Sequence, residues 1–448
     1  MFEGPIIPVT FRIGMPILIG NVFNLLFTIV DTLFISMIDS NSTAILSGTG
    51  LVFPLFFFFL AIATGISVGI GALVARAIGE DNTSTLTSAA DSGLALSISL
   101  AGISLIAGLF LGPHILSTLA GSELSQAALK AGERYFIALL PGLCLLLVWQ
   151  TILGILQGEG LTRYIAISVI VSTLVNLILD PIFIFSLEMG EFGAGIATSL
   201  SIFISFIVTL LICQRKKLSA PISAKIWRAN TALIKKIVNI GLPQSIGMLG
   251  MSVAFLLLNN LVSSINEAAM NAWTLVGRTD QMLLIPGFAL SGATITMVGQ
   301  NFGRKNFKRL KKIFHTNIIT GLVTVTIIAG VYNLIAMPLF SLFTDVEEVL
   351  KGAVQQVRII SFTTASVSAL FVIISTFQST GKPLPALFIT LMRIGAIAVP
   401  VAFILAKIVG LGMLGVYIGI VSGNLLILPI AWIWCSKHID KLNYNSVN

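Results

Sequence analysis

Long apolar runs recur along this chain of 448 residues, and no other feature constrains its fold as strongly. Each run holds about 18 or more residues with few charges, which is the length that an α-helix needs to cross a bilayer. Charged residues make up 10% of the chain, against about 25% in soluble proteins. The first run is too long for the core of a signal peptide, so we expect it to stay in the membrane. The sequence therefore predicts an all-α polytopic membrane protein.

Twelve spans can be placed, six on either side of a polar segment. The predicted spans cover residues 11–37, 46–76, 88–111, 132–156, 165–187, 194–213, 236–264, 270–300, 316–343, 357–378, 385–408 and 412–435. The segment between the two sets, "QRKKLSAPISAKIWRANTALIKK", carries seven basic residues and no acidic one. We therefore expect an N-terminal lobe over 1–213, a cytoplasmic basic linker over 214–235 and a C-terminal lobe over 236–448.

The basic residues are distributed unevenly over the loops. With the N-terminus in the cytoplasm, 19 of the 26 Lys and Arg residues fall in cytoplasmic segments and five in outer segments. This bias follows the positive-inside rule and predicts a multi-pass protein of the inner or plasma membrane with both termini in the cytoplasm. The basic clusters are short and lack interleaved aromatic residues, so we expect no nucleic-acid partner.

The two halves of the sequence repeat each other weakly. Four pairs align at offsets that fall slowly from 227 to 219, namely Pro16 with Pro243, Gly79 with Gly303, Gln157 with Gln378 and Pro181 with Pro400. Each half has an even number of spans, so both halves enter the membrane in the same direction. The repeat predicts two six-helix lobes related by a pseudo-two-fold axis along the membrane normal, as in several secondary transporters.

Two aspartates inside spans break this symmetry. Under the same offsets Asp31 aligns with Leu258 and Asp180 with Val399, so the acidic pair belongs to the first lobe alone. A carboxylate in mid-membrane costs about 2.5–3.5 kcal/mol and usually faces a bundle interior or a wet cavity. Because the repeated scaffold does not require this pair, we expect it to serve the function of the protein.

Each aspartate ends a polar stripe on one face of its helix. The stripes consist of Asn24, Thr28 and Asp31 in the first span, and of Thr173, Asn176 and Asp180 in the fifth. One interpretation is that these side chains only join helices through hydrogen bonds. The other is an ion site, because a buried carboxylate pair favours uptake of a proton, and its oxygen atoms with an amide and a hydroxyl also suit Na+. The spacing does not choose between H+ and Na+.

Five motifs, in order along the chain, resemble those of the multidrug and toxic compound extrusion (MATE) transporter family. They are "GMPILIGNVFNLLFTIVDTLFIS", "LVARAIGEDN", "VNLILDPIFIF", "GAGIATSL" and "LSGATITMVGQNFGRKN". The resemblance covers essentially the full length and is to the branch typified by DNA-damage-inducible proteins. It implies a cation-coupled antiporter that exports amphipathic, often cationic, organic compounds by alternating access.

The resemblance also implies roles for individual residues. The coupling-cation site would consist of Asp31, Asn176, Asp180 and Thr198, with H+ favoured and Na+ as the alternative. Pro16 would be the point at which the first span bends when this site is protonated. Tyr135 and Gln150 would line the same lobe, although Gln150 stands where relatives often have asparagine. The other large branch of the family has further acids in spans 7 and 10, and this chain has none there.

A second charged pair, Arg278 and Asp280, lies in span 8. Intramembrane charges usually pair, so these two would neutralise each other or partners on nearby helices, and a role in cargo binding or gating is the alternative. No ATPase subunit is implied, because the chain lacks a G-x-x-x-x-G-K-[ST] loop. One charge crossing 100 mV supplies about 2.3 kcal/mol, and a hundredfold cargo gradient needs about 2.7 kcal/mol. We expect no cofactor beyond the coupling ion, and a monomer in the lipid bilayer that carries a small organic cargo.

Two other functions stay open at this point. Lipid-linked precursor flippases belong to the same superfamily, but they tend to need a basic cavity. Here three intramembrane acids, Asp31, Asp180 and Asp280, stand against the two bases Arg278 and Arg393. An intramembrane hydrolase that uses the Asp31/Asp180 pair is the other alternative. Its two acid motifs would usually be alike and glycine-rich, whereas the flanks here are "IVDTL" and "ILDPI", so we expect a transporter and not an enzyme.

Overall fold

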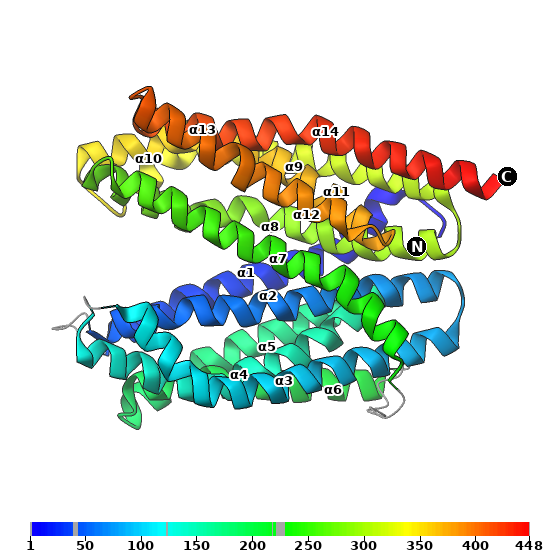
Figure 1. Cartoon of the computed structure of the whole chain (residues 1–448), viewed down its shortest axis with the longest axis horizontal. Helices are drawn as coiled ribbons and strands as arrows, with labels where there is room; N and C mark the ends of the chain where they lie inside the picture. Colours follow the sequence, from blue (N-terminus) through cyan, green and yellow to red (C-terminus); the bar gives the residue numbers. More distant parts are fainter. Residues whose placement is uncertain (1, 39–43, 122–123, 217, 221–228, 448) are drawn as a thin grey trace. The chain divides into compact units, whose positions relative to one another are not determined.

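The computed structural model describes residues 2–38, 44–121, 124–216, 218–220 and 229–447, with side chains up to residue 444. Over these residues the chain consists of helices joined by short turns (Figure 1), and twelve segments are long and apolar enough to span a membrane. The predicted all-α polytopic fold with twelve spans is confirmed.

The spans of the first half keep the predicted order. They are α1 (Ile6–Ser36), α2 (Ala44–Gly79), α3 (Thr83–Ala120), α4 (Gln126–Glu159), α5 (Thr162–Pro181) continued by the π-helical turn η1 (Ile182–Ser186), and α6 (Gly190–Arg215). The linker was predicted over 214–235, but the segment that separates α6 from α7 is shorter, because α7 already begins at Thr231. Residues 217 and 221–228 of this linker lie outside the described part of the chain.

The spans of the second half contain more interruptions. They are α7 (Thr231–Ser263), α8 (Glu267–Gly303), α9 (Phe307–Phe340), α10 (Glu347–Ile360) continued by η3 (Ser361–Thr363) and α11 (Thr364–Ser379), then α12 (Pro383–Leu391) with η4 (Met392–Ala398), α13 (Val399–Phe403) and η5 (Ile404–Ile408), and last α14 (Met413–Val447). The π-helical segments η1 and η4 lie next to Pro181 and Pro400. Proline lacks a backbone N–H and clashes with the preceding turn, which disturbs the regular α-helical hydrogen bonds there.

Several helices extend beyond their apolar runs because polar residues cap them. The third span was expected over 88–111, but α3 begins at Thr83, where the side chain of Asn82 accepts the N–H of Thr85 at 2.9 Å. Asn306 caps α9 in the same way, accepting the N–H of Arg309 at 3.1 Å. Such a side-chain acceptor satisfies one of the free N–H groups at a helix start. Hydropathy alone therefore does not predict where a helix begins when a polar cap fixes its start.

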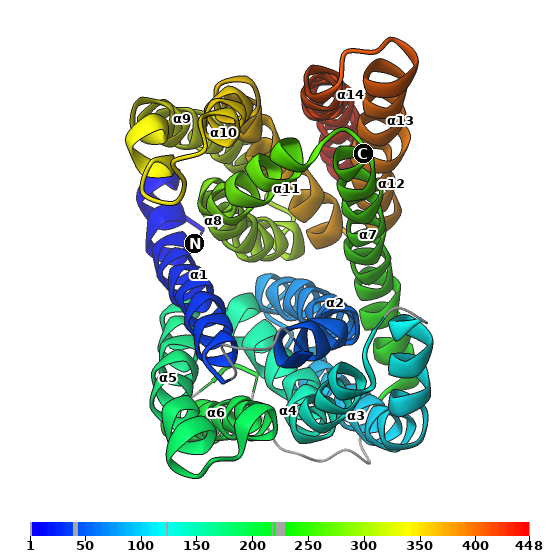
Figure 2. The same cartoon turned by 90° about the vertical axis from the view of Figure 1, so that its left-hand side faces the viewer.

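The described helices form two compact units, and the first comprises residues 19–78 and 82–242. In this unit α4 is the central helix, since 78% of its most apolar stretch is buried. It lies between α3 and α6, as Figure 2 shows in a view along the helices. The start of α7 also belongs to this unit, where Ile237 is fully buried in a cluster with residues of α2 and α3. A Cβ atom at Gly241 would overlap the backbone carbonyl oxygen of Gly65, so this contact requires glycine.

The second unit comprises residues up to Leu18, residues 79–81 and residues from Pro243 onward. Its central helix is α8, which packs against α9 and α11. The start of α1 belongs to this unit: Ile13 is buried in its core, and the hydroxyl of Thr10 donates to Oδ1 of Asn317 at 2.8 Å. The start of each half's first helix is thus part of the other half's compact unit. The sequence repeat predicts lobes over 1–213 and 236–448. The compact units are defined by packing and not by the repeat, so these lobe boundaries stay a prediction.

Candidate functional site

The fifth span brings an amide and a carboxylate together inside the first unit. Asn176 and Asp180 lie one turn apart on α5, and both are buried. The Nδ2 group of Asn176 donates to Oδ1 of Asp180 at 3.0 Å and reaches Oγ1 of Thr198 on α6 at 3.5 Å. The amide therefore links the carboxylate to the neighbouring helix. We call these three residues, together with Asp31, the carboxylate site.

Two oxygen atoms of the carboxylate site have no hydrogen-bond partner among the described residues. They are Oδ1 of Asp31 on α1 and Oδ2 of Asp180, and both are shielded from solvent. The two carboxyl groups lie close enough to interact electrostatically, and both act on the buried phenol of Tyr135 on α4. An unsatisfied buried carboxylate oxygen is costly. A proton or a hard cation bound there would remove this cost.

The helix that carries Asp31 is joined to α5 by a hydrogen bond. The hydroxyl of Thr173 donates to the backbone carbonyl of Phe23 on α1 at 3.3 Å. Thr173 lies seven residues before Asp180, on the same face of α5. The predicted stripe of span 5 therefore contributes both to the carboxylate site and to the contact that holds α1 against it.

The other two polar residues of the predicted stripe in span 1 do not contribute to the carboxylate site. Asn24 and Thr28 are exposed, and the hydroxyl of Thr28 donates to its own helix, at the carbonyl of Asn24, over 3.1 Å. Gln150 on α4 is half-buried, and no hydrogen bond joins it to the carboxylate site within the described residues. The i, i+4, i+7 spacing placed Asn24 and Thr28 on the face of Asp31, but the neighbouring helices cover this face only near the aspartate.

One contributor to the site was missed by sequence reasoning. Ser199, next to Thr198 on α6, accepts the backbone N–H of Gly142 at 3.2 Å and donates to the carbonyl of Ala138 at 2.7 Å. These two groups would bond each other in a regular helix, so the hydroxyl is inserted into the backbone of α4 beside Pro141. It fixes α6, and with it Thr198, against α4. The signal in the sequence is a proline–glycine pair inside span 4 facing the small residues of "GAGIATSL".

Close approach of the same two helices depends on Gly195. A Cβ atom at this position would lie 2.8 Å from the carbonyl oxygen of Tyr135 and 2.7 Å from the Cβ of Ala138. Real Cβ atoms do not come this close to backbone, so only glycine allows α6 to touch α4 here. The contact holds the backbone of Tyr135 beside the helix that carries Thr198.

The predicted hinge, Pro16, lies within α1, which is helical from Ile6 to Ser36. The division between the two compact units falls two residues after it, between Leu18 and Ile19. In α7 the division falls at the equivalent proline, between Leu242 and Pro243. Both prolines therefore mark the points at which their helices pass from one unit to the other.

The charged pair predicted in span 8 does not form an ion pair among the described residues. Arg278 is exposed, and no ion pair joins it to Asp280 in the part of the chain that the structure describes. Asp280 instead shares a hydrogen bond with the hydroxyl of Tyr332 on α9, which also contacts Thr279. Of the pairings expected, none joins Arg278 to Asp280 in the described chain, and Asp280 has a partner on a neighbouring helix. A role of the two residues in cargo binding or gating stays a prediction. Tyr332 could not be assigned to Asp280 from sequence, because the two lie on different spans.

A third intramembrane charge in this unit, Arg393 on η4, has the neutral amide of Asn424 as its partner. Its guanidinium donates to Oδ1 of Asn424 at 3.0 Å, and Nδ2 of Asn424 donates to Thr363 at 3.0 Å. No ion pair involves Arg393 among the described residues. Nor do these residues contain a group of three or more His, Cys, Asp or Glu side chains that could hold a metal ion.

Known proteins resemble this chain over almost its whole length. It is 28% identical over 440 residues to the "FAD transporter" of Shewanella oneidensis, covering 96% of this chain and 92% of the relative. It is 26% identical over 418 residues to the "Probable multidrug resistance protein NorM" of Thermotoga maritima, covering 92% and 88%. Among solved structures, an outward-facing multidrug resistance MATE family transporter of the MOP superfamily matches with a TM-score of 0.93 at 25% identity, covering 99% of this chain and 98% of the other.

The family comparison agrees with the motifs and with the fold. The MatE family model matches residues 16–182 and 243–404, which cover most of both halves and include Pro16, Asp31 and Asp180. One relative is a transporter by name and the other a probable multidrug resistance protein, and the described residues contain twelve helical segments that could span a membrane. This chain therefore belongs to the MatE family, the multidrug and toxic compound extrusion (MATE) transporters.

Proposed function

We propose that this protein is a cation-coupled antiporter that exports amphipathic, often cationic, organic compounds by alternating access. The observation that carries the proposal is the pair of carboxylates formed by half-buried Asp31 and buried Asp180, each with a shielded oxygen atom that no described group satisfies. A cation that binds there and leaves on the other side of the membrane would couple an ion gradient to export. The uneven distribution of basic residues supports a cytoplasmic location of both termini.

We favour H+ over Na+ as the coupling ion for a reason of geometry. Asn176 turns its amide nitrogen, and not its oxygen, toward Asp180 and Thr198. A proton needs a single carboxylate oxygen, whereas Na+ needs several oxygen ligands at once. The arrangement therefore offers Na+ fewer ligands than the residue types alone suggest. If Na+ binds, the amide of Asn176 must rotate to present its oxygen.

Protonation would act on the neighbouring part of α1. Asp31 lies on the portion of α1 that belongs to the first unit, and Pro16 lies just before that portion begins. Proline removes one helix hydrogen bond and makes bending less costly. A change of charge at Asp31 and Asp180 would thus favour bending of α1 near Pro16.

A second class of cargo, anionic aromatic compounds such as flavin nucleotides, is favoured by one observation. Arg393 carries a positive charge within a span, and among the described residues its hydrogen-bond partner is the neutral side chain of Asn424. Intramembrane charges without an opposite charge nearby are costly and are typical of ligand sites. The relative named "FAD transporter" makes this class worth testing directly.

The test is transport by purified protein in liposomes, with a pH gradient and a Na+ gradient imposed separately. We expect uptake of the cation ethidium to follow the pH gradient, and Asp180→Asn to abolish it. Glu347→Gln is the matched control, because Glu347 is an exposed acid paired only with Lys351 one turn away. Transport that follows Na+ and ignores pH would contradict H+ coupling. Accumulation of ethidium against its own concentration gradient, with neither ion gradient imposed, would contradict antiport altogether.

The same liposomes separate the two classes of cargo. If FAD is the cargo, FAD uptake follows the ion gradient, and Arg393→Gln reduces FAD uptake without reducing ethidium uptake. If neither compound moves while a lipid-linked precursor is flipped, the flippase alternative replaces both.

A further inference from the structure

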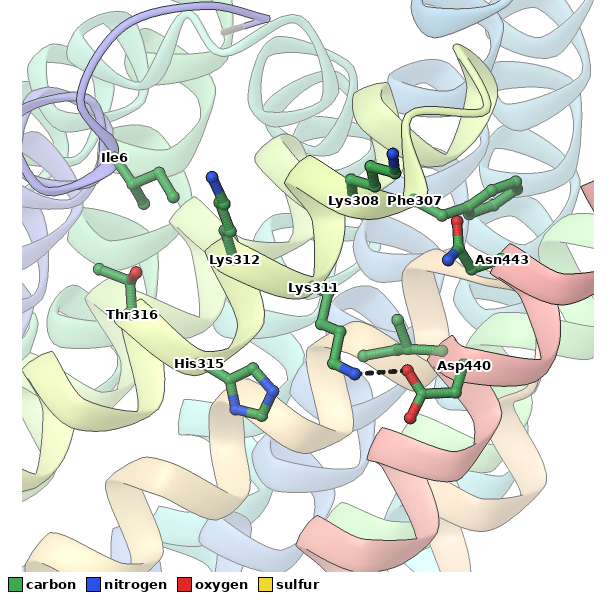
Figure 3. A pocket seen from close by; sticks show the side chains of 10 residues that line it. Ile6, Phe307, Lys308, Lys311, Lys312, His315, Thr316, Asp440 and Asn443 are labelled. Atoms are coloured by element: carbon green, nitrogen blue, oxygen red, sulfur yellow. Dashed lines mark hydrogen bonds and ion pairs between the residues drawn. The ribbon is translucent and has the colours of Figure 1, made fainter. Parts of the chain in front are cut away.

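A cavity of about 560 Å³ lies in the second unit, whereas the residues of the carboxylate site belong to the first. The first turns of α9 and the last turns of α14 form its walls, and Ile6 at the start of α1 closes one side (Figure 3). α9 and α14 pack against each other directly. The cavity therefore lies between spans, where both begin or end.

The α9 wall of the cavity is basic. Lys308, Lys311 and Lys312 stand within two turns of one helix and all line the cavity, as Figure 3 shows. Lys311 is paired with Asp440 of α14, with 2.6 Å between Nζ and Oδ1. Lys308 and Lys312 are exposed and form no ion pair with any described residue. One aspartate thus faces three lysines, and the cavity keeps a net positive charge.

The remainder of the cavity is apolar and partly aromatic. Phe307 and Ile439 line it and are buried. His315 lines it one turn beyond Lys311 and contacts the ring of Trp432 on α14, with 6.1 Å between ring centroids. Trp432 is 44% exposed, and exposed tryptophan near a span end is typical of the membrane–water interface. The cavity therefore combines positive charge with an interfacial, apolar surface.

Both walls continue as apolar surface away from the helix ends. On α9, Ile319 follows His315 by one turn and is 61% exposed. On α14, Ile433 precedes Asp440 by two turns and is also exposed. Residues at these spacings lie on the same face of their helices. A ligand with a negatively charged head and an apolar tail could place its head at the lysines and its tail on the apolar surface that adjoins them.

We infer that this cavity binds the phosphate headgroup of an anionic phospholipid, with Lys308 and Lys312 as the ligand-binding cations. Basic pockets between spans on the cytoplasmic side are suited to anionic headgroups. A soluble phosphate ester shares the same charge, but the interfacial aromatic ring and the exposed isoleucines favour the lipid. The inference does not depend on the proposed transport function, because it concerns binding alone.

The test uses the full-length protein in nanodiscs of phosphatidylcholine, with bound lipid counted by native mass spectrometry. Dioctanoyl phosphatidylglycerol, dioctanoyl phosphatidylcholine, glycerol phosphate and inorganic phosphate are titrated separately. We expect selective binding of phosphatidylglycerol. We expect Lys308→Gln with Lys312→Gln to weaken it about thirtyfold, since each of the two basic residues near a membrane surface contributes about 1 kcal/mol.

The matched control is Lys235→Gln with Lys236→Gln, which removes two exposed lysines one position apart at the start of α7, in the other unit. We expect both double variants to keep their fold, because all four side chains are exposed, and size-exclusion chromatography checks this. Equal weakening in the control would show that binding depends on net charge, and would overturn the site. Competition by glycerol phosphate at the concentration at which the lipid binds would overturn the assignment to a lipid.

Discussion

The amide of Asn176 donates to one carboxylate oxygen of Asp180 at 3.0 Å, while the other oxygen of Asp180 is buried and unpartnered. The amide orients the carboxylate and leaves a single free position beside it. Asp31 lies close enough to Asp180 for the two carboxyl groups to interact electrostatically, and a cation bound between two such groups would relieve their repulsion. This arrangement is what a site for a reversibly bound cation requires.

Replacing either acid tests whether this free position matters. We expect Asp31→Asn and Asp180→Asn each to reduce export by at least about tenfold, because an amide has no proton-binding site in this range of pH. The side chains are nearly equal in size, so folding should be retained. Drug resistance of cells at matched expression measures the effect, and Glu347→Gln serves as the control. Near-normal resistance in either variant would contradict the assignment of that acid.

The position of Pro16 predicts a difference between two equivalent prolines. Pro16→Ala should slow turnover more than it weakens cargo binding, because it makes bending of α1 more costly. Pro243→Ala should have a smaller effect, since Asp31 aligns with Leu258 in the second half and no acid pair acts on α7. Cargo binding and transport rates of the two variants give the comparison. If both variants lose turnover equally, the prolines serve packing alone.

The contact between α4 and α6 predicts a stability effect near the site. Gly195→Ala places a Cβ atom 2.8 Å from the carbonyl oxygen of Tyr135, so the helices must separate. We expect the melting temperature to fall and transport to weaken, at a cost of about 1–3 kcal/mol, as for other overpacked positions. Gly102→Ala on α3 is the matched control, because its Cβ would meet nothing within 4 Å. A thermal melt in detergent compares the two. An unchanged melting temperature for Gly195→Ala would show that this contact is not tight.

The inserted hydroxyl of Ser199 predicts a second effect at the same contact. Ser199→Ala leaves the N–H of Gly142 and the carbonyl of Ala138 without their bridge, which should cost about 1–3 kcal/mol if nothing replaces it. Ser117→Ala, which removes only a bond to its own helix at His114, should cost less. The same thermal melts measure both variants. Equal effects would mean that the bridge does not join the helices.

Much of the fold could be predicted because it follows from local patterns. Twelve apolar runs of sufficient length gave twelve spans, and the i, i+4 spacing placed Asn176 beside Asp180. The helix ends were less predictable, since caps such as Asn82 extend helices beyond their apolar runs. Nor could the sequence show to which compact unit the starts of α1 and α7 belong. Whether Ile13 packs in one unit or the other depends on contacts far apart in the sequence.

The site shows the same limit. Spacing predicted that Thr28 shares a face with Asp31, but it is exposed, because burial depends on which neighbouring helix covers each part of α1. Ser199 and Tyr332 were missed because their partners are backbone and side-chain groups on other helices. Residues that act within one helix can thus be inferred from sequence, and residues that join helices need the structure.

The central claim is that cation binding at Asp31 and Asp180 is coupled to cargo movement. The most direct measurement is the pH inside liposomes that contain the purified protein, followed with a trapped dye while cargo is added without any preformed gradient. We predict that cargo entering the liposomes drives protons out, so the interior becomes more alkaline, and that Asp180→Asn abolishes the pH change while cargo still binds. Cargo movement without any pH change in the unaltered protein, or an unchanged proton flux in Asp180→Asn, would contradict the account.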